Sequence, residues 1–235
     1  YLKNIQVEPS PLWLKRALES GGISSVNNVV DTANYVMLMM GQPIGVYDAD
    51  KIAGNQVFVR MAEDGEEVEL ADGSKIALTA EDLVVADNSR IMAVAGIAAA
   101  KTHEVDRATT NVFIEAACFT PLGVRKTASR LGLSTAASFR FERGVDRGRL
   151  THVLTQAAYH LRELTGAEVA KGLIDIVEPL KANKPIGLNL DRLNRMLGLS
   201  LKGREVADIL VALGFEILHF DHNTMTINVP THRVD

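Results

Sequence analysis

The segment that most constrains the fold is a short stretch rich in proline and lysine. Residues 178–185 read Glu-Pro-Leu-Lys-Ala-Asn-Lys-Pro. Proline fixes φ and has no N–H group to donate, so two prolines this close together interrupt any helix or central strand. The sequence therefore predicts a first domain over residues 1–177, a linker over 178–184 and a second domain over 185–235.

The first predicted domain mixes helices with short strands, as in the α+β class. Asp72-Gly73 separates two β-prone runs, which indicates a hairpin. The pattern predicts strands over residues 1–7, 56–61, 67–70, 83–86, 91–95 and 112–118. It predicts helices from a cap at Ser10 to Gly21, from Asp31 to Gly41, from Pro121 to Gly132 and over 149–164.

The second predicted domain is small. A strand over 186–190 is followed by a helix that Asp191 caps, which ends at Gly198. A second helix covers 203–213, and strands over 215–220 and 224–229 pair around a turn. This order resembles a winged helix, so we expect a large mixed α/β domain followed by a small winged-helix-like one.

Charge and cysteine content exclude several classes of protein. Lysine and arginine number 25 and acidic residues 29, so the net charge of −4 does not fit a polybasic nucleic-acid binder. The single cysteine excludes an internal disulfide and a cysteine-based zinc site, and it suits a cytoplasmic protein. No apolar run reaches membrane-spanning length and no signal peptide opens the chain, which we expect to be a fragment of something longer.

Common catalytic motifs are absent, so no catalytic residue is assigned. Glu115 stands inside a predicted buried strand, where a carboxylate is costly unless it is paired. Glu115 is either a site residue, or a structural residue that forms an ion pair or lies at the edge of a sheet. The small residues 96–100 either let a ligand approach or pack tightly. Residues 125–149 hold seven basic and two acidic side chains, which either contact phosphates or form a solvated, ion-paired surface.

Five segments in order carry a family resemblance: residues 27–31, 34–36, 41–43, 48–50 and 141–146. They resemble the B3/B4 region of the bacterial phenylalanyl-tRNA synthetase β subunit family, and the last 50 residues resemble its B5 domain. The resemblance implies an enzyme of two α and two β subunits that joins phenylalanine to tRNA(Phe) with ATP and Mg²⁺. It implies no cofactor for this fragment, and neither DNA nor a membrane as partner.

In that family B3/B4 hydrolyses tyrosine wrongly attached to tRNA(Phe). A pocket for phenylalanine rejects an added hydroxyl only about a hundredfold, so a second site that demands the hydroxyl is needed. The resemblance implies that Glu115 recognises this hydroxyl and that Thr135 and Ala137 line the editing pocket.

Five positions depart from the family pattern. Gly45 replaces a pocket histidine, Ser24 an arginine and Ala136 an aspartate, and Ala99 and Ala100 replace glycines. Methyl groups at the last two positions are expected to fill the pocket and to disfavour any positive φ. We therefore expect editing to be weakened or lost. The alternative is a non-catalytic module that binds tRNA or another subunit.

Two further groups of residues are implied. Arg125, Lys126 and Arg130 are candidates for tRNA contact. Asp235 resembles the first of the carboxylates that bind Mg²⁺ in the B5 domain, and a lone carboxylate does not hold this ion.

Overall fold

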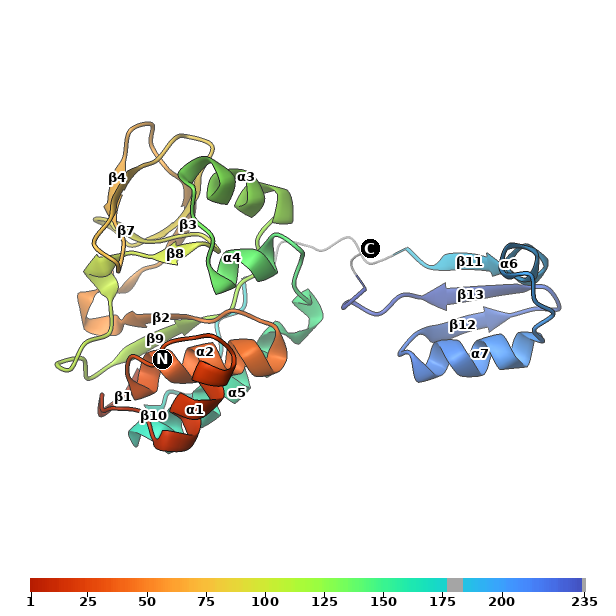
Figure 1. The fold of residues 1–235 in the computed structure, drawn as a ribbon, viewed down its shortest axis with the longest axis horizontal. Coiled ribbons are helices and arrows are strands. Elements are labelled where there is room, and N and C mark those ends of the chain that lie inside the picture. Colours follow the sequence, from red (N-terminus) through yellow and green to blue (C-terminus); the bar gives the residue numbers. More distant parts are fainter. Residues whose placement is uncertain (177–183, 234–235) are drawn as a thin grey trace. The chain divides into compact units, whose positions relative to one another are not determined.

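The computed structural model describes residues 1–176 and 184–233, in which the chain forms two compact units (Figure 1). The larger unit covers residues 1–172 and the smaller one residues 173–235. The predicted linker lies almost entirely outside the described residues, so its bounds stay a prediction. Both units combine helices with antiparallel sheets, which confirms the α+β class.

The larger unit contains two four-stranded antiparallel sheets and a separate hairpin. The first sheet has the order β10 (Glu168–Val169), β1 (Leu2–Lys3), β9 (Val112–Glu115) and β2 (Gly45–Asp48). The second has the order β3 (Phe58–Met61), β6 (Leu83–Ala86), β7 (Ile91–Val94) and β8 (Ala98–Ala99). Strands β4 (Glu67–Glu69) and β5 (Lys75–Ala77) form the hairpin predicted around Asp72-Gly73.

Helices cover these sheets in two groups. The five helices are α1 (Leu12–Ser20), α2 (Asn28–Met40), α3 (Pro121–Leu131), α4 (Ala136–Phe141) and α5 (Leu150–Thr165). Helices α2 and α5 share a core with the first sheet, and α3 and α4 share a core with the second (Figure 1). Short 3-10 turns occupy Ala49–Lys51, Ala53–Asn55, Lys101–His103 and Arg147–Arg149.

Strand β9 contributes to both cores. Successive side chains of a strand point to opposite faces. Val112 and Ile114 accordingly pack with α2 and α5, whereas Phe113 packs against the core of the second sheet. Glu115 is two residues beyond Phe113, so its carboxylate lies on the side of the second sheet.

Two helix starts differ from the prediction. Helix α1 begins at Leu12, and the predicted cap Ser10 instead donates its hydroxyl to Asp31 Oδ2 at 2.6 Å. Helix α2 begins three residues early, because the Asn27 side chain accepts the N–H groups of Val29 and Val30. Asp31 therefore lies in the first turn, where its carboxylate binds the preceding loop.

Several other predicted bounds were too long, and strands β2, β8 and β10 and helix α4 were not predicted. The strand over 1–7 is reduced to Leu2–Lys3, and the strand over 112–118 ends at Glu115. Strand β2 was not predicted, because Pro43 and Gly45 both disfavour a strand. Helix α4 escaped prediction because its six residues are too few to show a helical period.

The smaller unit has the predicted order of elements. Strands β11 (Ile186–Asn189), β13 (Thr224–Asn228) and β12 (Glu216–Phe220) form one antiparallel sheet in this order. Helices α6 (Leu190–Leu197) and α7 (Gly203–Ala212) connect β11 to β12 along the chain. Its core is Leu190, Val206, Met225 and Ile227. The cap of α6 is Asn189, which accepts Arg192 N–H, and not Asp191 as predicted.

The carboxylate of Asp31 in α2 holds the segments before and after α1, and its contribution to stability can be tested. Its side chain is fully buried and accepts bonds from the hydroxyls of Ser10 and Ser25 and from Val26 N–H. We expect Asp31→Ala to lower the free energy of unfolding by about 3 kcal/mol, because three donors lose their acceptor. Trp13 is the only tryptophan and lies in α1, so its fluorescence in urea reports this unit.

The exposed Asp64 provides the control, since Asp64→Ala should change the free energy by less than about 0.5 kcal/mol. Equal effects of the two substitutions would contradict a structural role for Asp31.

Candidate functional site

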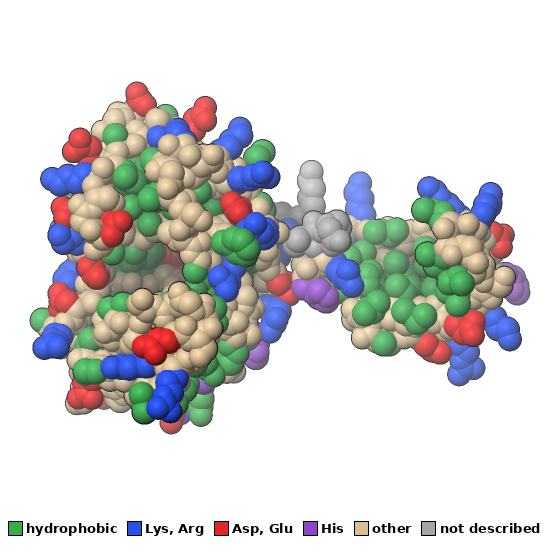
Figure 2. All heavy atoms as spheres, in the orientation of Figure 1, with side chains coloured by type: hydrophobic (Ala, Val, Ile, Leu, Met, Phe, Trp, Pro, Cys, Tyr) green, Lys and Arg blue, Asp and Glu red, His purple; other side chains and the backbone are tan. Residues whose placement is uncertain are grey.

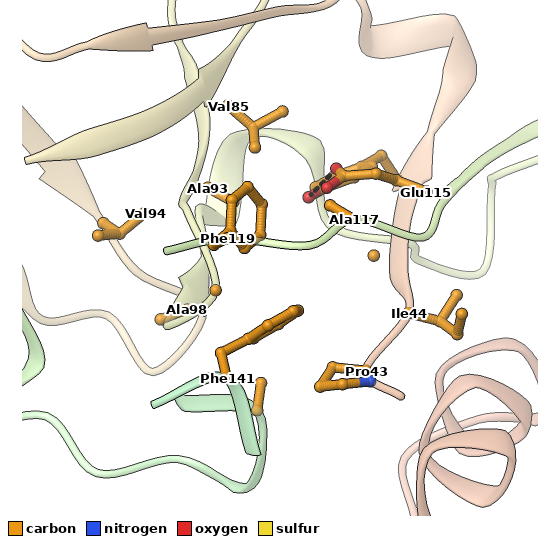
Figure 3. Close-up of a pocket in the computed structure, with 14 residues that line it drawn as sticks. Pro43, Ile44, Val85, Ala93, Val94, Ala98, Glu115, Ala117, Phe119 and Phe141 are labelled. Atoms are coloured by element: carbon orange, nitrogen blue, oxygen red, sulfur yellow. Dashed lines mark hydrogen bonds between the residues drawn. The ribbon is translucent and has the colours of Figure 1, made fainter. Parts of the chain in front are cut away.

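A cavity of about 90 Å³ lies between the two sheets of the larger unit. Figure 2 shows it as a hollow in the face between β2 and β8. Strands β2, β7, β8 and β9 and helix α4 all contribute to its walls. The lining is mostly apolar and includes Pro43, Ile44, Val85, Ala93, Val94, Ala98, Ala117, Phe119, Ala137 and Phe141 (Figure 3).

Pairing of β2 with β9 places the polar groups of this cavity. Gly45 stands directly opposite Glu115, and Tyr47 stands opposite Phe113. Residues 45 and 47 share a strand face, so Tyr47 reaches back across Gly45 towards Glu115. Gln42 holds the start of β2 in place, because its Nε2 donates to Ala117 O at 2.9 Å.

Glu115 and Tyr47 form a hydrogen-bonded pair. The Tyr47 hydroxyl donates to Glu115 Oε2 at 3.2 Å (dashed in Figure 3). Burial raises the pKa of Glu115 to about 7, and the bond from Tyr47 opposes part of that rise. Burial, with the nearby Glu115, also raises the pKa of Tyr47 well above its usual value. At neutral pH the carboxyl group is thus protonated to a greater extent than an exposed glutamate.

Gly45 makes room for the tyrosine ring. A Cβ atom at position 45 would lie 2.9 Å from Cε2 and from the hydroxyl oxygen of Tyr47. Such distances are far below a normal carbon contact of about 3.5–4.0 Å. The present position of the Tyr47 ring therefore requires glycine at position 45.

Thr135 acts on the cavity through helix α4. Its hydroxyl oxygen accepts Ser138 N–H at 3.0 Å and donates to Ile97 O at 2.7 Å. This cap ties the start of α4 to the turn before β8, and it orients Ala137 and Phe141 towards the cavity. Thr135 itself is not among the lining residues.

The structure brings together only three of the eight predicted pocket residues: Gly45, Glu115 and Ala137. Ser24 is exposed in the loop after α1, and Ala136 is exposed in the first turn of α4. Neither lines the cavity.

The expectation that Ala99 and Ala100 fill the pocket is not met. Ala99 is exposed and Ala100 is buried beside Leu70, whereas Ala98 lines the cavity. Alternation along β8 turns Ala99 away from the cavity, and Ala100 lies beyond the end of β8, bridged to Leu70. Neither alanine is strained, since neither is among the non-glycine residues with positive φ, and Ala100 has φ −81°.

Sequence reasoning missed Tyr47, Phe119 and Phe141. Tyr47 is the important omission, because it is the partner of Glu115. A predicted strand over 45–48 would have placed Gly45 and Tyr47 on one face. The two phenylalanines come from a loop and from α4 and contact each other edge to face, with centroids 5.1 Å apart. No local sequence pattern predicts that contact.

The three basic residues proposed for tRNA contact lie on α3. Arg125 and Lys126 are exposed. Arg130 instead forms an ion pair with the buried carboxylate of Asp82, which also accepts the Thr127 hydroxyl at 2.8 Å. Arg130 thus has a structural partner, and Arg125 and Lys126 are the better placed of the three for an outside ligand.

The described residues contain no group of three or more His, Cys, Asp or Glu side chains that could hold a metal. Asp235, the predicted first Mg²⁺ ligand, lies outside them. None of the helices in residues 1–176 and 184–233 combines the length and apolar character that a membrane crossing requires.

Comparisons with known proteins give two domain matches. The B3/4 domain family matches residues 1–166, and the tRNA synthetase B5 domain family matches residues 186–235. The phenylalanine–tRNA ligase beta subunits of Geobacter sulfurreducens and Carboxydothermus hydrogenoformans are 40% and 42% identical to the chain. Each alignment covers 100% of this chain and 29% of the relative, so the chain spans under a third of their length.

Among solved structures, an N-terminal fragment of the phenylalanyl-tRNA synthetase beta subunit from Pyrococcus horikoshii aligns with a TM-score of 0.43 and 17% identity. That alignment covers 100% of this chain and 66% of the fragment. The likeness is too distant to support an argument.

Glu115 should make stability depend on pH. Between pH 4.5, its usual pKa, and about pH 7, the unfolded chain has lost the Glu115 proton and the folded chain still holds it. The free energy of unfolding therefore falls as pH rises through this window, by at most about 3 kcal/mol from this group. We expect the stability difference between the natural chain and Glu115→Gln to shift by this amount from about pH 4 to about pH 8.

Urea unfolding followed by Trp13 fluorescence measures that difference at each pH. Glu19→Gln, at an exposed position of α1, is the matched control and should show a constant difference. A constant difference for Glu115→Gln as well would show that its carboxyl group is not buried as described.

Proposed function

The chain belongs to the B3/4 domain family, and from this premise we propose that it is part of the β subunit of a phenylalanine–tRNA ligase. In this proposal the cavity beside Glu115 takes the tyrosyl group of Tyr-tRNA(Phe), and its hydrolytic activity is weak or lost. The observation that carries the proposal is a single carboxyl group in a cavity lined mainly by apolar side chains, where it is bonded to a phenol.

A buried carboxyl group suits recognition of a hydroxyl. It costs free energy in apolar surroundings unless a donor satisfies it. A ligand that supplies a hydroxyl removes this cost, and the same ligand without the hydroxyl leaves the carboxyl group unpaired. Sites of this kind discriminate strongly, by roughly 10⁴ to 10⁵. This is the discrimination between tyrosine and phenylalanine that an editing site needs.

The same cavity lacks a group to activate water. Ester hydrolysis by general base catalysis needs a proton acceptor near the attacking water. Glu115 and Tyr47 are the only titratable residues of the lining, and they bond to each other. Gly45 stands where the family resemblance places a histidine. The described lining residues therefore include a group for recognition and no free side chain for catalysis.

The wider setting follows from the same premise. We place the chain in the cytoplasm, in an enzyme with α subunits and tRNA(Phe) as partners. ATP and Mg²⁺ serve other parts of that enzyme, and this chain needs no cofactor of its own. Neither DNA nor a membrane is a partner.

A second candidate function is a non-catalytic module that binds tRNA or another subunit. The exposed Arg125 and Lys126 on α3 favour it, since cations on an otherwise acidic chain are suited to phosphate contact. The occupation of the cavity by the Tyr47 hydroxyl favours it too. The two candidates differ in whether deacylation depends on Glu115.

The two candidates are tested by the rate at which the complete tetrameric enzyme, carrying this segment, deacylates Tyr-tRNA(Phe). We expect slow hydrolysis by the natural sequence. Gly45→His should raise the rate at least about tenfold, because general base catalysis contributes roughly 10² to 10⁴. Glu115→Ala combined with Gly45→His should remove that gain, since the hydroxyl is no longer recognised.

Gly187→His is the matched control, because Gly187 is exposed in the smaller unit with no atom within 4 Å of its Cβ position. It should leave the rate unchanged. Rapid hydrolysis by the natural sequence would contradict the loss of activity. Absence of hydrolysis in every variant would support the non-catalytic module.

A further inference from the structure

We propose that Tyr47 is an internal ligand of this cavity: its phenol takes the place beside Glu115 that a phenolic ligand would take, and it must leave before such a ligand binds. The proposal deepens the proposed function and rests on it for the natural source of the phenol, a tyrosyl group. Three features of the cavity support it.

The first feature is the bond that Tyr47 makes. Its hydroxyl donates to Glu115 Oε2 at 3.2 Å, across 68 residues of sequence. A tyrosyl ligand has the same phenol group and would donate to the same carboxyl group. The chain thus supplies intramolecularly the donor that a ligand would supply, and the two compete for one place.

The second feature is the space that remains. The free volume is about 90 Å³, whereas a cavity that binds benzene measures about 150 Å³. An aromatic ring therefore does not fit while Tyr47 stays in place. Rotation of Tyr47 out of the cavity frees both the volume of its ring and the carboxyl group of Glu115.

The third feature is what holds Tyr47 there. Gly45 leaves the space that the ring uses, since a Cβ atom would lie 2.9 Å from the hydroxyl oxygen. The ring also stacks against Phe113, with centroids 6.4 Å apart. Strand β2 is the edge strand of its sheet and pairs only with β9, and a rotation of the Tyr47 side chain about its own bonds leaves that backbone pairing intact. A side chain at position 45 would displace the ring.

Binding of p-cresol to the 235-residue chain, measured by calorimetry, tests the proposal. We expect Gly45→Ala to bind p-cresol at least about tenfold more tightly than the natural chain, because a closed state lowers the apparent affinity by the fraction that is open. Tyr47→Ala should do the same. Tyr47→Ala also removes a buried ring and thereby destabilises the core. Gly45→Ala, which keeps the ring, is therefore the primary variant.

Three controls define the result. Gly187→Ala should bind as the natural chain does, since its Cβ position has no neighbour. Gly45→Ala should raise the affinity for toluene, which lacks the hydroxyl, less than it raises the affinity for p-cresol. Adding Glu115→Ala should remove the preference for p-cresol over toluene.

Weaker or unchanged p-cresol binding in Gly45→Ala would overturn the proposal, and so would equal gains for toluene and p-cresol. Hydrolysis does not enter this measurement. A failure here therefore leaves the deacylation test of the proposed function standing, and a failure of deacylation leaves this result standing.

Discussion

The alternation of side chains along strand β9 is the constraint on which the rest of the site depends. The strand lies between two apolar cores, so Val112 and Ile114 pack under α2 and α5 while Phe113 packs towards the second sheet. A slip of one residue would exchange these faces and turn Glu115 towards the core of α2 and α5. Because the register is fixed in this way, Glu115 has to lie in the apolar space between the sheets.

A carboxyl group in that position destabilises the chain unless it finds a donor or stays protonated. The structure uses both means: Tyr47 donates a hydrogen bond, and the pKa of Glu115 rises to about 7 because of burial. The bond that satisfies Glu115 also occupies the place of a ligand. Stability and recognition therefore compete for one oxygen atom, and Gly45 favours stability by leaving room for the tyrosine ring.

Local signals predicted much of the fold and less of the site. The Asp72-Gly73 hairpin, the glycines that end α2 and α3, and the order of elements in the smaller unit were all readable from the sequence. Strand β2 was not, because its stability comes from pairing with β9 and not from its own residues. The missing strand is the reason that Tyr47 was overlooked, whereas Ala99 and Ala100 were expected in the pocket from the family resemblance alone.

The sequence alone determined that a carboxylate stands in an apolar run of residues and that residue 45 has no side chain. Both are statements about residue type, and they hold in any fold. Only the tertiary structure decided that Gly45 faces Glu115 and that Tyr47 bonds to it, since that contact joins residues 68 positions apart. The physical reason is that strand pairing depends on the burial of both cores at once, which no local stretch of sequence encodes.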